Sequence, residues 1–299
     1  MLAQLLRNLL LAQVLIGAAL GYWLGQPEPL PLATMCLVAM GLPFATMILV
    51  DTVSALRSRA AEPWSLWWRS LFGEYVAGIV IFLFRQPWTR KVPTVLPATS
   101  QTPQIPVVLI HGYMCNHRIW DDVSDVLRQK GHTVIAVNLE PVYASIDRYA
   151  PIVEAAVNDL CRITGAQQVA LVGHSMGGLA IRAWMRAHGT TRVARALTLG
   201  TPHQGTQMAK GVHSPNGKQM AWKSRWLADL AAAETDATRS LFRIAITPQD
   251  NIVFPQREQR MPGVPVQVFE GLGHLQMCLD PNVIHWVTQQ LSDLPHARH

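Results

Sequence analysis

Charged residues are scarce in this 299-residue sequence, and this scarcity limits what the protein can be. Asp, Glu, Lys and Arg make up 15% of the chain, whereas a typical soluble domain carries about 25%. A disordered chain combines low hydrophobicity with high net charge, and 49% hydrophobic residues exclude that class. Four cysteines are too few for a disulfide-stapled scaffold. The position of the apolar excess therefore decides the class of protein.

Runs of basic residues are missing too. The net charge is +6, but Lys and Arg are scattered, and no run of five or more occurs. Zinc-finger, RNP and basic-zipper patterns do not occur either. We therefore expect no nucleic-acid partner.

The apolar excess lies at the start of the chain, where residues 1–90 hold 55 hydrophobic residues. One apolar stretch runs from Leu9 to Leu24, and a second runs from Leu32 to Val50 without a charge. The second would form a helix roughly 28 Å long, which matches the hydrocarbon thickness of a bilayer. A proline-rich break at 26–31 separates them. This pattern predicts a membrane-anchoring region at 1–90 that begins with a transmembrane hairpin.

Two alternatives remain for these stretches. The first stretch has the length of a cleaved signal peptide, although a second apolar stretch follows it at once instead of a soluble sequence. Both stretches can also be buried helices of a soluble protein.

A third apolar stretch, Leu71–Phe84, contains Glu74. A charge at the centre of a span costs about 2.5–3.5 kcal/mol on insertion scales. Trp64, Trp67 and Trp68 precede the stretch, and tryptophans gather at headgroup level. An interfacial helix is therefore favoured over a third span.

The number of spans decides on which side of the membrane the rest of the chain lies. Arg7 flanks the first span, Arg57 and Arg59 follow the second, and the break between them carries Glu28. The positive-inside rule then places the N-terminus in the cytoplasm. Two spans leave the following domain cytoplasmic, which we favour, and three would place it outside.

Residues 91–105 are rich in proline and threonine, as expected of a linker. From 106 to 299, strand-like and helix-like segments alternate, which predicts an α/β domain with a parallel sheet and helices on both faces. The predicted strands are 107–110, 133–137, 169–172, 197–199, 242–246 and 266–269. The predicted helices are 119–129, 149–163, 176–187 and 281–291, the last with an Asp280-Pro281 start.

The sequence Gly173-His-Ser-Met-Gly177 lies between a predicted strand and a predicted helix. On its own, Gly-x-Ser-x-Gly is a weak signal, but the strand–turn–helix context is the one that a nucleophile elbow requires. We therefore predict Ser175 as a nucleophile. A glycine-rich helix start without chemistry is the alternative.

A nucleophilic serine needs a base and an acid that orients the base, in the chain order Ser, Asp or Glu, His. Asp250 and His274 each follow a predicted strand, at the edge where parallel sheets bind their ligands. Asp280 and Glu270 compete with Asp250 as the acid. We expect Asp280 to cap a helix, and Glu270 is too close to His274 in sequence.

The backbone N–H groups of Tyr113 and Met176 are the expected oxyanion-hole donors, since the loop after the first strand and the residue after the nucleophile usually supply them. We expect His111 to position that loop and His203 to be structural. His111, His174 and His203 lack the spacing of a zinc site.

Residues 106–291 resemble the bacterial lipases and esterases of the α/β-hydrolase superfamily, most of all triacylglycerol lipases and small class 2 lipases. The matching segments are 107–112, 173–178, 199–205, 250–253 and 271–274. The resemblance implies Ser175 as nucleophile, His274 as base, Asp250 as orienting acid, and Tyr113 and Met176 as oxyanion hole. The membrane region lies outside the resemblance; from the apolar stretches at 1–90 we expect a bacterial inner-membrane location, and we expect no cofactor. Some relatives hold calcium near the catalytic histidine, but here only Asp280 is close, so we expect no metal. Residues 206–238 occupy the lid region and form a short lid or a plain surface insertion.

Together these features predict a membrane-anchored serine hydrolase that cleaves carboxylic esters through an acyl-enzyme. The expected partners are the lipid bilayer and an apolar ester or lipid substrate. Acyl transfer to another alcohol is the nearest alternative, and a catalytically silent binding protein is a second.

Overall fold

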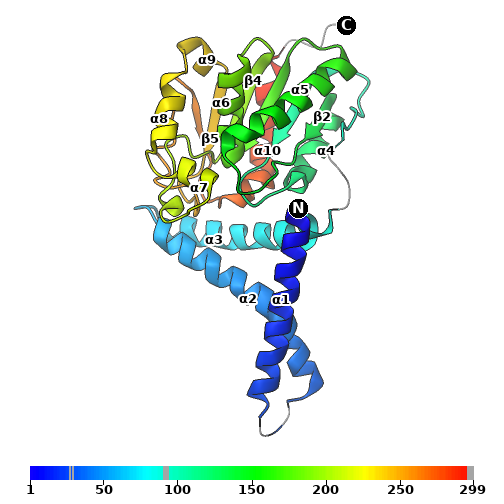
Figure 1. The fold of residues 1–299 in the computed structure, drawn as a ribbon, viewed down its shortest axis with the longest axis vertical. Coiled ribbons are helices and arrows are strands. Elements are labelled where there is room, and N and C mark those ends of the chain that lie inside the picture. The colour runs from blue at the N-terminus through cyan, green and yellow to red at the C-terminus, as the bar shows by residue number, and fades with distance from the viewer. Residues whose placement is uncertain (27, 29, 90–93, 295–299) are drawn as a thin grey trace.

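The computed structural model describes residues 1–26, 28, 30–89 and 94–294. Helices α1 (Leu2–Leu24) and α2 (Leu32–Ser58) form a hairpin that projects from a globular α/β domain (Figure 1). Helix α3 (Trp64–Gly78) lies across the face of the domain that meets the hairpin. It continues into the π-helix η1 (Ile79–Arg85) and the 3₁₀ turn η2 (Gln86–Trp88).

Small residues and one polar pair join the two hairpin helices. A Cβ atom on Gly17 would lie 2.8 Å from the Ala39 Cα atom, so the glycine permits this close approach. Gln13 Nε2 donates to Thr46 Oγ1 across the hairpin at 2.9 Å. By length and composition, three helices in the described part of the chain can cross a membrane: Leu2–Leu24, Leu32–Ser58 and Trp64–Trp88. The predicted apolar N-terminal helices are therefore confirmed.

The α/β domain is built on a sheet of six parallel strands in the order β2-β1-β3-β4-β5-β6. Central strand β3 is buried along its whole length. This burial explains why it reads as a continuous aliphatic run. The strands are β1 (Gln104–Ile110), β2 (His132–Ala136), β3 (Val169–His174), β4 (Val193–Leu199), β5 (Phe242–Ile246) and β6 (Val266–Val268).

Helices cover both faces of the sheet, as predicted. One hydrophobic cluster packs α5 (Ala150–Thr164) and α6 (Met176–His188) against the sheet. The other packs α4 (Asp121–Gln129) and α10 (Pro281–Ser292) on the opposite face. Shorter helices fill the connections: η3 (His117–Trp120), η4 (Ile146–Tyr149), η5 (Gln207–Ala209), α7 (Pro215–Met220), α8 (Arg225–Ala232), α9 (Asp236–Ser240) and η6 (Leu275–Cys278).

The predicted linker at 91–105 is partly structured. Residues 91–93 lie outside the described residues, but Leu96 pairs with Val134 through two backbone hydrogen bonds, at the free edge of β2. Strand β1 begins at Gln104, two residues before the predicted start of the domain. The proline- and threonine-rich composition of residues 91–105 predicts a loop. The open edge of β2 nevertheless offers unpaired backbone N–H and C=O groups, and Leu96 pairs with them.

The carboxyl ends of the strands face the N-terminal helices. Ser54, near the end of α2, donates its hydroxyl to the Asn251 carbonyl in the loop after β5. Gln256 Nε2 donates to the Ser58 carbonyl at 2.9 Å. The edge at which a parallel sheet binds its ligands is thus directed toward the apolar helices.

Candidate active site

Ser175 occupies the tight turn between β3 and α6. Its backbone has φ 55° and ψ −128°, a region that non-glycine residues rarely adopt and that is typical of a nucleophile elbow. The flanking glycines allow the turn to pack: a Cβ atom on Gly173 would lie 2.6 Å from Gly178 N, and one on Gly177 would lie 2.0 Å from the Ile110 carbonyl oxygen. The motif therefore has the strand–turn–helix setting that its sequence predicts.

Asp250 and His274, from the loops after β5 and β6, are hydrogen-bonded to each other. His274 Nδ1 lies 2.8 Å from Asp250 Oδ2, and both side chains are buried. The other carboxylate oxygen, Oδ1, accepts the backbone N–H groups of Ile252 and Val253 at 2.9 and 2.7 Å. Asp280, the competing acid, accepts the Asn282 N–H at the start of α10, as expected of a helix cap.

His274 lies beside the elbow that carries Ser175. Its ring centroid is 4.5 Å from that of His174, the residue before the serine. His174 Nε2 also hydrogen-bonds the His274 carbonyl at 3.0 Å. Among the described residues no hydrogen bond joins the Ser175 hydroxyl to His274, a contact that in many enzymes tightens only when substrate binds.

Electrostatics raise the pKa of His274, whereas burial lowers the pKa of its histidine neighbours. Burial lowers the pKa of His274, but the negative charges of Asp250 and Glu74 outweigh burial and raise this pKa above its ordinary value. Burial holds the pKa of His174 well below its ordinary value. It lowers the pKa of His111 to about 4. His274 is thus the histidine in this cluster that is suited to take up a proton.

The loop after β1 lies against the serine. A Cβ atom on Gly112 would lie 2.7 Å from Ser175 Cβ, so only glycine fits there. His111 Nε2 accepts the Leu139 N–H at 2.9 Å, which leaves its Nδ1 to donate to the Gly112 carbonyl at 2.8 Å. His111 therefore holds the loop in place. Tyr113 is the next residue after Gly112.

Met176, the other predicted oxyanion donor, is the first residue of α6. The N-terminus of a helix presents unpaired N–H groups and the positive end of the helix dipole. The two predicted donor residues thus belong to the loop after β1 and to the start of α6.

His203 has structural partners. His203 Nε2 lies 3.0 Å from Thr198 Oγ1, and its carbonyl accepts from Arg182. Across the described ranges, no group of three or more His, Cys, Asp or Glu side chains is placed to hold a metal ion.

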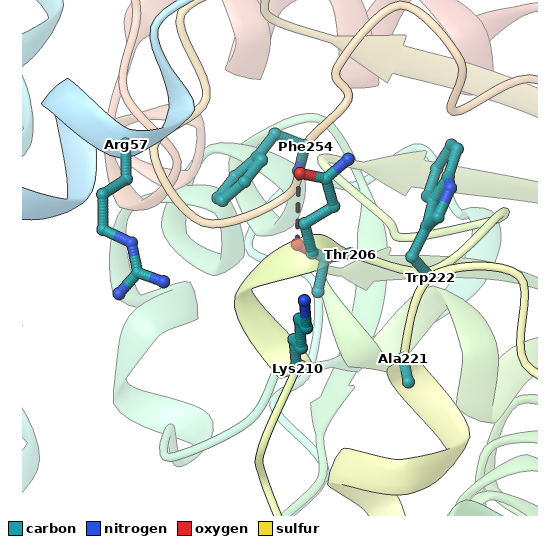
Figure 2. A pocket seen from close by; sticks show the side chains of 7 residues that line it. Arg57, Thr206, Lys210, Ala221, Trp222 and Phe254 are labelled. Atoms are coloured by element: carbon teal, nitrogen blue, oxygen red, sulfur yellow. Dashed lines mark hydrogen bonds between the residues drawn. The ribbon is translucent and has the colours of Figure 1, made fainter.

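The predicted lid region, residues 206–238, contains several short helices that are tied to the domain. Asn216 Nδ2 donates to the Val142 carbonyl at 2.7 Å, and Trp226 Nε1 donates to Asp147 at 2.9 Å. A cavity of about 660 Å³ opens where this region approaches α2 (Figure 2). Its lining combines cationic and aromatic side chains and includes none of Ser175, Asp250 and His274. The lining residues are Arg57, Thr206, Gln207, Lys210, Ala221, Trp222 and Phe254.

One residue beside the candidate site has a role that the sequence pattern did not identify. Glu74, on α3, accepts the backbone N–H groups of Leu275 and Gln276, which directly follow His274, at 2.8 and 3.1 Å. In the sequence it is only a charge in an apolar stretch. Such a charge is itself a signal, since ionisable residues in apolar segments are usually functional.

Comparisons with known proteins identify the fold of the α/β domain. Residues 105–274 match the family model described as alpha/beta hydrolase fold. A triacylglycerol lipase of Burkholderia plantarii is 29% identical over 168 residues, which cover 52% of this chain and 44% of that protein. A triacylglycerol lipase of Pseudarthrobacter phenanthrenivorans is 30% identical over 119 residues, 37% of each chain. The chain thus spans less than half the length of either relative.

A solved structure shows the same fold. Lipase B of Aspergillus fumigatus superimposes with a TM-score of 0.57 at 13% identity, covering 86% of this chain and 82% of that one. Together with the six-stranded parallel sheet and the serine elbow, the family match establishes that the chain belongs to the α/β-hydrolase fold family.

Proposed function

We propose that the protein is a membrane-anchored serine hydrolase that cleaves carboxylic esters with an apolar acyl chain. The observation that carries the proposal is the buried Asp250–His274 hydrogen bond beside the strained elbow of Ser175. A serine becomes a strong nucleophile only with such a base and orienting acid.

The chemistry divides into two acyl transfers. Ser175 Oγ attacks the ester carbonyl carbon while His274 Nε2 takes the hydroxyl proton, and the backbone N–H groups of Tyr113 and Met176 stabilise the oxyanion. The alcohol leaves with the proton from His274. Water then gives a proton to His274 and attacks the acyl-enzyme, which releases the carboxylic acid and restores the Ser175 hydroxyl.

The position of the site supports a lipid-like substrate. The carboxyl edge of the sheet faces α2 and α3. An ester dissolved in the bilayer would therefore reach the site along the N-terminal helices. The triacylglycerol lipases to which this chain is similar support the same substrate class.

The packing of α3 favours two membrane spans. Ile81, in the continuation of α3, is fully buried in a core cluster of the α/β domain, and Glu74 is 2% exposed. A helix with these contacts lies along the membrane surface beneath the domain rather than across the bilayer.

The two ends of the hairpin that lie away from its turn both contact the α/β domain. Leu2 and Leu6 of α1 pack against Val142, and Ser54 of α2 contacts the loop after β5. With two spans, the catalytic domain lies on the same side of the membrane as Arg7 and Arg57, which is the cytoplasmic side by the positive-inside rule.

Substitution of Ser175 tests the activity. Ser175→Ala in the full chain should abolish turnover of p-nitrophenyl esters and labelling by a fluorophosphonate probe. Ser240→Ala, at an exposed serine on α9, is the matched control and should retain both. Turnover by purified Ser175→Ala protein at the parent rate would contradict the proposal.

Cysteine labelling in sealed vesicles tests the topology. A membrane-impermeant maleimide should label Lys130→Cys, exposed at the end of α4, from the cytoplasmic side. It should label Glu28→Cys, in the hairpin turn, from the opposite side. The parent protein, with its four native cysteines, supplies the background. Labelling of both positions from one side would exclude the two-span arrangement.

A further inference from the structure

Helix α3 presents two different faces. Trp68, Phe72 and Val76, four residues apart, are 60%, 72% and 43% exposed and form an apolar stripe. On the other face, Trp67 and Glu74 are buried against α2 and the catalytic domain. One face of α3 is thus apolar and exposed, as suits contact with a lipid surface, and the other face packs against the loop that carries His274.

The buried face interlocks with the His274 loop. Besides the two hydrogen bonds to Glu74, a Cβ atom on Gly73 would lie 2.1 Å from Gln276 Oε1. A Cβ atom on Gly273 would lie 2.4 Å from Glu74 Oε2. Gln276 Oε1 accepts the Gly273 N–H at 3.1 Å. Glycines on both sides allow helix and loop to approach this closely, so the loop has little freedom to move independently of α3.

A buried carboxylate is a costly way to hold two segments together. A charged group removed from water loses several kcal/mol of solvation, so apolar packing would join them at lower cost. In the described part of the chain, no Lys or Arg side chain forms an ion pair with Glu74. Burial raises the pKa of Glu74 to about 7, so this carboxyl group is ionised above that pH. The positive charge that its carboxylate then faces is the one that His274 acquires on protonation.

We propose that Glu74 is a positioning residue of the active site, which couples the membrane-facing helix α3 to the catalytic histidine. By accepting the Leu275 and Gln276 N–H groups, it fixes the loop so that His274 stays aligned with Ser175. Its negative charge also stabilises the imidazolium that forms when His274 takes the serine proton. This inference rests on the proposed ester hydrolase activity.

Other titratable groups lie around Glu74, and their influence on the pKa of His274 must be distinguished from that of Glu74. Burial raises the pKa of Cys115 to about 12 and that of Cys278 well above its ordinary value, so both thiols stay neutral. Asp51, on α2, is a half-buried carboxyl group in the same region, and its Oδ2 atom is buried. The groups to consider are Asp51, Cys115, Cys278, His274, Asp250 and His174.

Two substitutions of Glu74 separate its hydrogen-bonding role from its charge. Glu74→Ala removes both, and in the full chain in nanodiscs its kcat for a soluble p-nitrophenyl ester should fall by about 10- to 100-fold with KM nearly unchanged. Glu74→Gln keeps an oxygen that accepts both N–H groups, so it should restore most of kcat at high pH. Because it lacks the charge, its kcat/KM should rise with pH at a lower pH than that of the parent.

Two controls accompany these variants. Glu62→Gln makes the same chemical change at a carboxylate that joins the N-terminal region to the domain through Arg257 and should leave both kcat and the pH profile unchanged. Asp51→Asn should leave the pH profile of the Glu74→Gln variant where it is, which assigns the shift to Glu74.

The outcomes distinguish a failure of the proposed role of Glu74 from a failure of the proposed ester hydrolase activity. Parent-like kcat for Glu74→Ala, or a parent-like pH profile for Glu74→Gln, would overturn the role of Glu74. If Glu74→Ala does not fold, as judged by thermal unfolding, the pH profile of Glu74→Gln decides. A parent protein that neither turns over esters nor reacts with the fluorophosphonate would instead refute the ester hydrolase activity itself.

Discussion

The Nδ1 atom of His274 lies 2.8 Å from Asp250 Oδ2, while Asp250 Oδ1 accepts two backbone N–H groups. Both carboxylate oxygens are therefore engaged, and the carboxylate has one orientation. An acceptor at Nδ1 places the imidazole hydrogen there and leaves Nε2 free to accept a proton. Asp250 thus selects the histidine tautomer that can activate Ser175.

Replacement of Asp250 by Asn should lower kcat by about 10⁴-fold, with a small change in KM. The amide can still accept the Ile252 and Val253 N–H groups, but its NH₂ group then points at Nδ1 and favours the wrong tautomer. Steady-state kinetics on a p-nitrophenyl ester measure this effect. Asp280→Asn is the control, since Asn caps helices as well as Asp. If Asp280→Asn lost activity and Asp250→Asn kept it, Asp280 would be the orienting acid.

The pH dependence of kcat/KM should reflect His274. Only neutral His274 can accept the serine proton, so activity should rise as pH increases through its pKa. Asp250 and Glu74 raise this pKa, so the half-maximal point should lie above the ordinary value of about 6.5. A kcat/KM profile between pH 5 and 9 measures it. A midpoint below 6 would show that burial, and not the two carboxylates, dominates at His274.

Substitution on the outer face of α3 should affect bilayer substrates selectively. Phe72→Gln removes the most exposed side chain of the apolar stripe, and burial of a Phe side chain in lipid is worth about 1.5–3 kcal/mol. We expect the apparent KM for an ester dispersed in vesicles to rise by about tenfold, while kcat for a soluble ester stays unchanged. Ile163→Gln, at an apolar residue exposed on α5, should change neither. Equal effects of Phe72→Gln on both substrates would argue against a membrane-facing stripe.

Gly112→Ala should impair catalysis through a direct clash. The added Cβ atom would lie 2.7 Å from Ser175 Cβ and 3.2 Å from its hydroxyl oxygen, so the loop that carries Tyr113 must move away from the serine. Loss of one oxyanion donor costs about 10²–10³-fold in kcat, and we expect a decrease of that size. Gly41→Ala, with no described atom within 4 Å of the new Cβ, is the control. Retention of full kcat in Gly112→Ala would exclude this loop from the oxyanion hole.

The buried ion pair between Arg182 and Glu234 should matter for stability. Arg182 Nε lies 2.6 Å from Glu234 Oε1, and the two side chains are 2% and 8% exposed. Arg182→Met should lower the free energy of unfolding by about 3–5 kcal/mol, because it leaves Glu234 buried and unpaired. The double variant Arg182→Met, Glu234→Leu should recover much of this loss in thermal unfolding. If the double variant were less stable than Arg182→Met, Glu234 would have to form another stabilising interaction besides the ion pair with Arg182.

Much of the α/β domain follows from local sequence patterns. Aliphatic runs such as 242–246 predict buried strands, and the Asp280-Pro281 pair predicts the start of α10, where the structure has it. The serine elbow depends on a few consecutive residues, so its context is visible in the sequence. The pairing of Leu96 with the edge of β2 is not visible, because backbone hydrogen bonds at an open edge depend little on side-chain type.

The sequence by itself determined where the apolar excess lies, the order of strands and helices, and Ser175, Asp250 and His274 as candidates in family order. These are properties of short segments and of their order along the chain. Only the tertiary structure decided the position of α3, the helix that contains Glu74. The N–H groups that satisfy this buried carboxylate come from Leu275 and Gln276, about 200 residues away, and only the fold brings them together. For this physical reason, the sequence shows Glu74 only as a charge in an apolar stretch, whereas the structure places it beside the candidate catalytic residue His274.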